Sequence, residues 1–233
     1  MERDVYRVAL DGHEVPDAAS RAALVESSHA ASGAMYFAKL DSLNVEALRV
    51  LGSVGFYVVD ATVTLATSGA GATVDAAVSV CEATPAMYDD ILNVAGSAFR
   101  YSRFHLDPQV PSALAHRIKR EWIASYTRKE RGALLLAGAV DGRTAGFLAV
   151  LDQQIDGRRV RTIDLIGVDA AYQGRGVGTA LTRYFVNAYA RDFDVLQVGT
   201  QAANVPSLRM YMKCGFIPTS TRYVVHLHVP ART

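Results

Sequence analysis

The sequence contains few of the residues that mark specialised classes of protein. Among its 233 residues are only two cysteines, Cys81 and Cys214, too few and too isolated for a disulfide framework or a zinc site. The formal net charge of +1 argues against a nucleic acid or an anionic membrane as a partner held by bulk electrostatics. We therefore expect a protein of a reducing compartment that binds neither nucleic acid nor membrane.

A secretion signal and a long apolar run are also missing. Residues 1–4 are charged and lack the apolar core that secretion signals carry. The most apolar stretch, 61–80, is interrupted by Thr, Ser, Gly and Asp75, which predicts two strands around a glycine turn instead of a membrane span. Hydrophobic residues make up 50% of the chain, enough for a sizeable core, so we expect a cytoplasmic globular protein.

The most informative feature is the glycine-rich loop 173–179, Gln-Gly-Arg-Gly-Val-Gly-Thr, between an apolar strand pattern and an amphipathic helix pattern. Backbone N–H groups and the positive end of the helix dipole meet at such a helix start, which suits a pyrophosphate. Gly174, Gly176 and Gly178 have no side chain to keep phosphate oxygens away from the backbone. The alternative is a helix that begins with glycines only to pack tightly. A dinucleotide loop needs a different glycine interval and a Walker loop needs a lysine, so the ligand is of another kind.

A second motif follows about 30 residues later and runs from Asn204 through Tyr211 to Gly215-Phe216. Together, Gln173-x-x-Gly-x-Gly and this motif resemble the acyl-CoA pyrophosphate loop and the asparagine, tyrosine and Gly-Phe ending of the GNAT acetyltransferase superfamily. Either motif alone would be a moderate signal, and two in order at the family's spacing are a strong one. The resemblance implies an N-acetyltransferase with acetyl-CoA as co-substrate and no metal.

The pattern of elements agrees with the α/β class, a mixed sheet in the GNAT acyl-CoA N-acyltransferase fold. Ser68 to Ala72 is small and flexible and predicts a linker, so we expect domains at 1–70 and 71–233. The predicted order after the linker is strand 73–80, helices 84–98 and 111–126, strands 132–140, 144–151 and 160–168, helix 177–191, strand 194–200, helix 205–213 and strand 223–229.

The first 70 residues contain an echo of the second motif. Segment 44–56 aligns with 204–216 at a constant offset of 160 residues, as from Asn44 to Asn204, and six of the pairs are identical. Leu51 stands where the later segment has Tyr211, and no glycine-rich loop precedes Asn44. We interpret residues 1–70 as a degenerate GNAT-like lobe that lost its chemistry and shapes a substrate pocket. Chance similarity of two helix-to-strand elbows is the alternative.

The donor site follows from the resemblance. Acyl transfer needs an anchored donor, a polarised carbonyl, an uncharged amine and a protonated leaving thiolate. The strand before the loop would pair with the pantetheine arm, an N–H near Ile166 or Val168 would face the thioester oxygen, and Gly167 would mark a bulge. The expected cofactor-binding residues are Ile166, Val168, Gln173, Gly174, Arg175, Gly176, Val177, Gly178, Thr179 and Asn204.

Two side chains are candidates for proton transfer. Tyr211 is the candidate acid, because a phenol with a pKa near 10 stays protonated at neutral pH and can donate to the leaving sulfur. An aromatic core residue is the alternative. Asp164 is the candidate base. The alternatives are a strand carboxylate that faces solvent or binds a substrate hydroxyl, and a sugar amine, being less basic than lysine, that gives its proton to water. His226 and His228 share a strand face, but the sequence shows no third metal ligand.

The last question is which amine accepts the acetyl group. Within the superfamily, the chain resembles the dTDP-fucosamine acetyltransferases in its extra lobe and in 101–104, 121–123 and 200–211. The resemblance implies a nucleotide-linked 4-amino-4,6-dideoxy sugar, with Tyr101 and Arg103 as substrate residues and the Arg103 guanidinium suited to a phosphate. A protein N-terminus, a lysine or another small amine is the alternative acceptor, and a non-catalytic CoA-binding protein is a third class. The oligomeric state stays open, a homodimer included.

Overall fold

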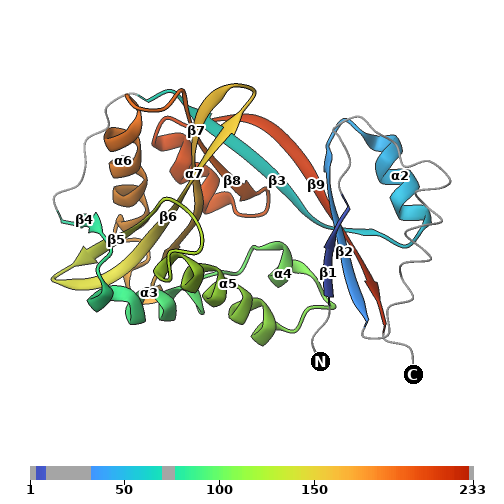
Figure 1. Cartoon of the computed structure of the whole chain (residues 1–233), viewed down its shortest axis with the longest axis horizontal. Helices are drawn as coiled ribbons and strands as arrows, with labels where there is room; N and C mark the ends of the chain where they lie inside the picture. The colour runs from blue at the N-terminus through green and yellow to red at the C-terminus, as the bar shows by residue number, and fades with distance from the viewer. Residues whose placement is uncertain (1–3, 9–32, 70–76, 231–233) are drawn as a thin grey trace. The chain divides into compact units, whose positions relative to one another are not determined.

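The computed structural model describes residues 4–8, 33–69 and 77–230. The chain divides into two compact units that interleave along the sequence. The first unit comprises Met1–Val63, Gln201–Ala203 and Ser220–Thr233, and the second comprises Thr64–Thr200 and Asn204–Thr219. Strands β3 (Tyr57–Thr67) and β9 (Ile217–Val229) contribute residues to both units (Figure 1). The domain boundary expected at residues 70 and 71 stays a prediction.

In the described residues, the first unit has a small sheet and the helix α2 (Val45–Ser53). Strand β1 (Asp4–Arg7) is parallel to β2 (Ala34–Asp41), and β2 is antiparallel to β9. Helix α2 covers one face of this sheet. Alternate residues of β2 point to that face, as the period of two in a strand requires. The core consists of Ala34, Tyr36, Ala38, Leu40, Ala47, Leu51, Phe56 and Val225.

The second unit is built on a larger mixed sheet. Its strands are β4 (Ser79–Glu82), β5 (Leu134–Val140), β6 (Arg143–Ile155), β7 (Arg158–Val168) and β8 (Val195–Gln201), in the spatial order β8-β7-β6-β5-β4. Neighbours from β4 to β7 are antiparallel, and β7 is parallel to β8. The parallel strands β7 and β8 are joined by a helical crossover, as a parallel pair requires.

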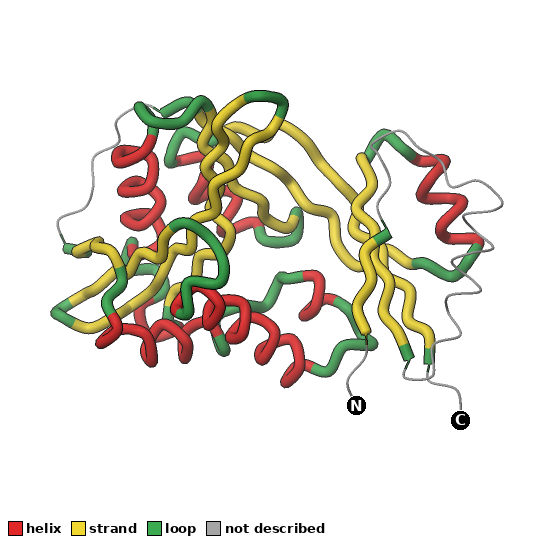
Figure 2. Tube along the Cα trace, in the orientation of Figure 1, coloured by secondary structure: helices red, strands yellow, loops and turns green. Residues whose placement is uncertain are grey.

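Helices cover both faces of the second unit's sheet (Figure 2). Helices α3 (Tyr88–Ala95) and α5 (Ser112–Thr127) pack on one face, where Ile91 and Ile123 meet Phe147. Helix α6 (Val177–Tyr189) packs on the other face over Gly138, where an added Cβ would lie 3.2 Å from Leu181. The short elements are η1 (Pro85–Met87), α4 (Arg103–Leu106) and η2 (Ala170–Tyr172), and α7 (Val205–Lys213) follows β8.

The fold class and the order of elements expected from the sequence are confirmed, with differences at the ends. Strand β9 begins at Ile217 instead of 223, because its first half contains Pro218 and a polar run that shows no alternation. Helix α3 ends at Ala95 instead of 98. Helix α4 was not predicted, since four residues are too short to show a helical period. Residues 70–76, which hold most of the predicted linker and the start of the predicted strand 73–80, lie outside the described residues.

The aligned segments 44–56 and 204–216 have the same local geometry. Asn44 has φ −85° and ψ 64°, Asn204 has φ −86° and ψ 62°, and each side chain accepts a hydrogen bond from the backbone three residues on. Gly55 and Gly215 both have positive φ, at 97° and 87°, where a residue with a Cβ is strained. Each segment is therefore an Asn-capped helix that ends at a left-handed glycine and continues into a strand.

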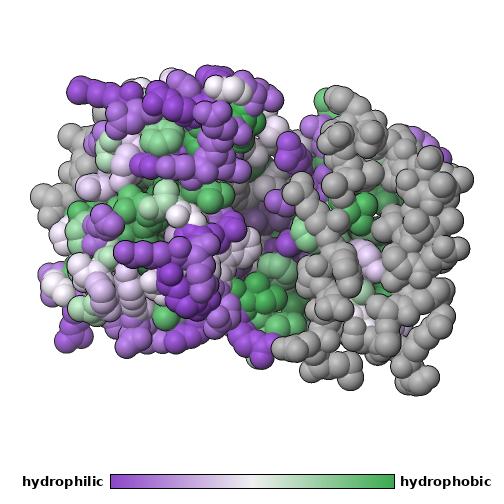
Figure 3. Space-filling view, in the orientation of Figure 1, coloured by the Kyte–Doolittle hydropathy of each residue, from purple (hydrophilic) through white to green (hydrophobic). Residues whose placement is uncertain are grey.

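The surface of the second unit is largely hydrophilic on the face shown in Figure 3. In Figure 3, hydrophilic residues cover much of the face that is visible, and hydrophobic groups show between them. Among the described residues, no helix is both long enough and apolar enough to cross a membrane.

Candidate active site

The glycine loop forms the start of α6. Gly176 is the N-cap residue in the left-handed conformation, with φ 81° and ψ 0°, and Gly174 has φ 77°. The first backbone bond of the helix runs from Ala180 N to Gly176 O at 2.9 Å, so the N–H groups of residues 177–179 point out of the helix end. An added Cβ at Gly174 would meet no atom within 4 Å. The loop is thus an open helix N-terminus with the donors that a pyrophosphate needs.

The other residues of the loop have separate roles. An added Cβ at Gly178 would lie 2.9 Å from Met210 Sδ, so this glycine lets α6 approach α7. Gln173 Nε2 donates to the Val168 carbonyl at 3.4 Å, and exposed Arg175 lies 3.5 Å from Asp141. Gly178 therefore serves packing, whereas Gly174 and Gly176 set the open turn, and the binding of a phosphate by this turn stays a prediction.

Strand β7 leaves β8 halfway along its length. The parallel pairing of the two strands covers residues 160–163 of β7 and ends at Ile163 with Val198. Beyond that point, Asp169 N still donates to Ala145 O at 2.9 Å on the β6 side. Because successive N–H groups of a strand alternate in direction, the N–H groups of Ile166 and Val168 point away from β6. The pantetheine arm is predicted from the sequence to bind along this edge.

The bulge in β7 is at Asp164 and not at Gly167, which corrects the expectation. Ala149 pairs with Leu165 and Val150 with Ile163, so Asp164 is the extra residue. A glycine is needed at position 167 for another reason, because an added Cβ there would lie 2.7 Å from the Phe147 ring. A side chain at this position would collide with the Phe147 ring, so the glycine permits a close contact instead of marking an irregular strand.

Asp164 is anchored by three donors from α5 and the following turn. Its Oδ2 accepts from Trp122 Nε1 at 2.9 Å, from Tyr126 OH at 2.7 Å and from Arg131 Nε at 3.0 Å. Burial raises the pKa of this carboxyl, but hydrogen bonds from Arg131, Tyr126 and Trp122 outweigh it and hold the pKa below its usual value. A general base needs a free lone pair and a pKa nearer neutrality, so this geometry gives Asp164 an anchoring role and gives the predicted base role no support.

The partners of Asp164 were not predicted from the sequence. Two cations lie over the Trp122 ring, with Lys119 Nζ 4.6 Å and Arg131 Cζ 5.0 Å from its centroid. Trp122 and Tyr126 are one helical turn apart, and this spacing was the available signal for a shared polar partner. A shallow, open hollow beside them is lined by Ile118, Trp122, Ser125 and Arg131.

Tyr211 lies at the centre of the 204–216 segment. Its side chain is 2% exposed, and its ring centroid is 5.9 Å from that of Phe216. Burial and the nearby Cys214 raise the pKa of the phenol, so it stays protonated at all physiological pH values. Asn204 caps α7 by accepting from Ser207 N at 3.3 Å. The capping alternative for Asn204 is therefore present, and its contact with CoA stays a prediction.

The expected substrate residues lie at the start of α4. Tyr101 is 37% exposed, Arg103 Cζ lies 4.6 Å from the centroid of the Phe104 ring, and Phe104 is buried. Phe104 thus anchors this loop in the unit. The exposed phenol of Tyr101 is accessible to a ligand, and the substrate roles of Tyr101 and Arg103 stay predictions.

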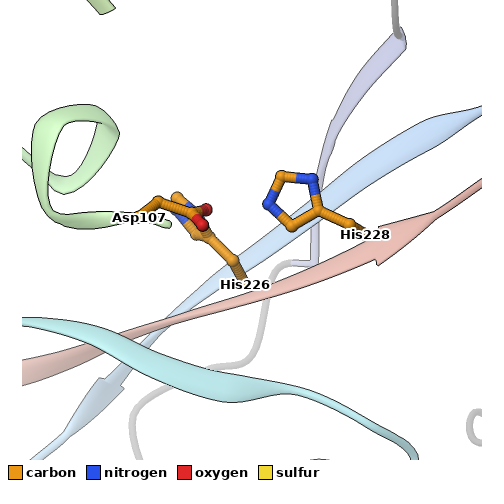
Figure 4. Close-up of side chains that lie close together, drawn as sticks. All are labelled: Asp107, His226 and His228. Carbon is orange, nitrogen blue, oxygen red and sulfur yellow. The ribbon is translucent and has the colours of Figure 1, made fainter. Parts of the chain in front are cut away.

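His226 and His228 lie on one face of β9. Figure 4 draws them together with Asp107, which belongs to the second unit. Within the first unit, the ring of His226 is 6.5 Å from that of Phe37 in an edge arrangement, and the ring of His228 is stacked 6.3 Å from that of Tyr57. These ring contacts make both imidazoles part of the packing of the first unit.

A model of the acetyltransferase (GNAT) family matches residues 91–216, more than half of the chain. The chain belongs to this family. The match begins in α3 and ends at Phe216, so it includes the β7 edge, the glycine loop and α7. The expectation of a GNAT acetyltransferase is thereby confirmed, and acetyl-CoA is the co-substrate of this family.

Individual relatives are distant. The spore coat polysaccharide biosynthesis protein SpsD of Bacillus subtilis (strain 168) is 24% identical over 144 residues, which cover 61% of this chain and 48% of SpsD. The chain therefore spans about half the length of this curated relative. A GCN5-related N-acetyltransferase structure from Sphaerobacter thermophilus matches with a TM-score of 0.61 and 15% identity over 91% of this chain and 66% of that chain. A tandem GNAT protein from the clavulanic acid biosynthesis pathway matches with a TM-score of 0.59 and 14% identity over 93% and 69%. At these identities the structures show the fold alone.

Proposed function

We propose that the protein transfers an acetyl group from acetyl-CoA to the amine of a nucleotide-linked amino-deoxy sugar, by direct transfer in a ternary complex. The observation that supports it most is the combination of the open loop at 173–176 with the unpaired edge of β7. An anion site and a free strand edge, joined by a short turn, match a ligand that has a pyrophosphate at one end and amide groups along an extended arm.

The donor would be held from two sides. The N–H groups of residues 177–179 bind the pyrophosphate oxygens, with the left-handed turn of Gly176 directing them. The N–H groups of Ile166 and Val168 bind the pantetheine arm and polarise the thioester carbonyl, because a donor aimed at the developing oxyanion stabilises the transition state.

The reaction then needs the acceptor nitrogen to lose two protons and the sulfur to gain one. The amine, once deprotonated, attacks the thioester carbon, the C–N bond forms, and the C–S bond breaks. The nitrogen loses its second proton to solvent, and the Tyr211 hydroxyl gives its proton to the departing sulfur and recovers one from solvent, so that the products are the amide, free CoA and one released proton. The raised pKa of Tyr211 keeps the phenol protonated, so its proton is present when the thiolate leaves.

The acceptor class has weaker support. SpsD is described as a protein of polysaccharide biosynthesis, which agrees with a sugar acceptor. Tyr101 offers an exposed aromatic ring for a base or a sugar, and Arg103 offers a cation for the phosphates. A cytoplasmic location is part of the same proposal.

A screen for CoA release tests this function. The intact chain is incubated with acetyl-CoA and a panel of nucleotide amino sugars, polyamines, aminoglycosides and peptides, and free thiol and the mass of the acetylated product are measured. We expect the highest kcat/KM with dTDP-4-amino-4,6-dideoxy sugars. Preference for a peptide would support the protein-acetylating alternative, and acetyl-CoA binding without any acetylated amine would contradict an enzymatic role.

A pair of glycine variants tests the donor site. Gly176 and Gly142 have similar positive φ values, 81° and 74°, so Gly176→Ala and Gly142→Ala carry similar conformational strain. Only Gly176 lies in the loop, and we expect only Gly176→Ala to weaken acetyl-CoA binding in calorimetry. Equal binding by both variants would remove the loop from the donor site.

A further inference from the structure

Helices α4 and α5 hold a chain of three polar side chains that the reaction above does not use. Ser102 Oγ lies 2.6 Å from His105 Nδ1, and His105 Nε2 lies 3.3 Å from His116 Nδ1. The two imidazole rings meet edge to face, with centroids 4.8 Å apart. The three groups therefore form a continuous hydrogen-bonded line with His116 at one end.

Ser102 is placed for this line and not for helix capping. It is the N-cap residue of α4, where a serine hydroxyl ordinarily accepts from a backbone N–H, but its side chain makes no capping bond. The residue is 6% exposed, and a buried hydroxyl needs a partner. That partner is the His105 ring.

His105 stays neutral near physiological pH. Burial, together with His116 and the cations Lys119 and Arg100, lowers the pKa of His105 to about 4. A neutral imidazole has one N–H and one lone pair. If His105 Nδ1–H donates to Ser102 Oγ, its Nε2 must accept from His116 Nδ1–H. The second nitrogen of His116 then carries a lone pair, and within the described part of the chain it has no protein partner.

The helix α5 connects this line to the edge of β7. His116, Lys119 and Trp122 follow one another at intervals of three residues, so they lie along one side of the helix. Lys119 Nζ lies over the Trp122 ring, and Trp122 donates to Asp164 at the bulge where β7 leaves β8. The glycine loop begins α6 on the opposite face of the sheet, so α5 is the helix whose side chains reach the bulged part of β7 from the face that the donor loop leaves free.

We infer that His116 is the general base that takes the proton from the acceptor amine, with His105 and Ser102 as the positioning residues that fix its tautomer. The inference rests on the proposed function, since it needs an amine as acceptor. The ammonium gives a proton to His116 Nε2, His116 releases it to water, and the amine lone pair attacks the thioester carbon. As the C–S bond breaks, Tyr211 protonates the leaving thiolate, the nitrogen loses its second proton to solvent, and Tyr211 regains a proton from solvent, so one proton is released overall.

The test is the pH dependence of turnover. With an amine from the CoA-release screen, we expect His116→Gln to lower kcat about 100-fold at neutral pH, the range of a lost general base, and to leave the KM for acetyl-CoA within about twofold. The loss should shrink as the pH rises, because the amine deprotonates without help. His105→Gln and Ser102→Ala should shift the same profile by less. Arg117→Gln, an exposed neighbour on α5, is the matched control and should behave like the wild type.

The outcomes separate this inference from the proposed function. Wild-type turnover and pH profile in His116→Gln would overturn the base role whichever amine is acetylated. If a polyamine or a peptide is acetylated with the expected His116 dependence, the sugar proposal fails and the base role stands. Nitrogen NMR of the free protein adds a readout without an acceptor: His105 should be neutral at pH 6 with its proton on Nδ1, and a His105 that titrates like an exposed histidine would contradict the line of hydrogen bonds.

Discussion

The segments 44–56 and 204–216 share their caps, their hydrogen bonds and their glycine conformation, and they differ in the residue at the centre. Phe56 N donates to Leu51 O and Phe216 N to Tyr211 O, both at 3.1 Å. Leu51 and Tyr211 are both buried, at 0% and 2% exposure. Helix geometry therefore fixes a buried position at the end of each helix, and the side chain placed there decides whether that position can donate a proton.

The surroundings of the two segments also differ, because only the second lies in a unit with a predicted donor site. The second follows β8 in a unit that also holds the glycine loop and the open edge of β7, whereas the first has α2 packed on a small sheet with no such loop among the described residues. A shared local fold with a tyrosine and a neighbouring glycine loop in only one copy is what a degenerate lobe would show. Variants at four aligned positions of the two segments test this comparison, and they follow in order of decreasing expected effect.

The largest effect should come from the central residue. Tyr211→Phe keeps the ring against Phe216 and removes the acid, so we expect kcat to fall about 100-fold with little change in acetyl-CoA affinity. Tyr36→Phe, at a buried tyrosine of the first unit, is the control and should keep full turnover. Unchanged kcat in Tyr211→Phe with a verified amine would rule out the acid role.

The next effect is on stability and should appear in both segments. Gly55→Ala and Gly215→Ala place a Cβ in the left-handed region, which costs about 1–2 kcal/mol of unfolding free energy. Gly55→Ala should cost more, because its Cβ would lie 3.3 Å from Leu227 Cδ1, whereas at Gly215 the nearest atom, Thr67 Oγ1, is 3.9 Å away.

Gly52→Ala is the opposite control for urea unfolding. Gly52 is inside α2 and an added Cβ meets nothing within 4 Å, so this variant should gain about 0.5–1 kcal/mol. Equal stabilities of all three variants would show that backbone conformation is not what the two glycines supply.

The capping residues should separate stability from binding. Asn44→Ala and Asn204→Ala each remove an N-cap bond, worth about 1 kcal/mol. Only Asn204→Ala should also raise the KM for acetyl-CoA, since only Asn204 lies in the donor motif. A serine at either position retains the cap, and a KM that rises equally in Asn44→Ala and Asn204→Ala would argue against a CoA contact.

The smallest effect is at the surface of α2. Glu46 and Arg49 form an exposed ion pair of 2.6 Å that the second segment lacks, because Pro206 stands at the place of Glu46. Exposed pairs contribute little, so we expect Glu46→Gln to leave the melting temperature unchanged within error. A clear loss would mean that α2 depends on this pair more than its exposure indicates.

The sequence predicted the parts of the molecule that depend on local chemistry. The loop at 173–179 and the capped helix at 205–213 were placed correctly, because glycines with positive φ and an Asn cap act over a few residues. The Asp164 contacts and the line from Ser102 to His116 were missed. Each joins elements from different parts of the chain, and no periodicity records which side chains will meet after the sheet has formed.

The interleaving of the two units has a consequence for folding. The pairing of β2 with β9 joins Ala34 to Val229, roughly 200 residues apart in the chain. Such contacts are slow to form, because the loop must close before the contact stabilises it. During synthesis the first unit therefore has to wait for the last strand, and β2 presents an unpaired edge until then. We expect delayed refolding and chaperone dependence to concentrate in the first unit, although it is much the smaller of the two.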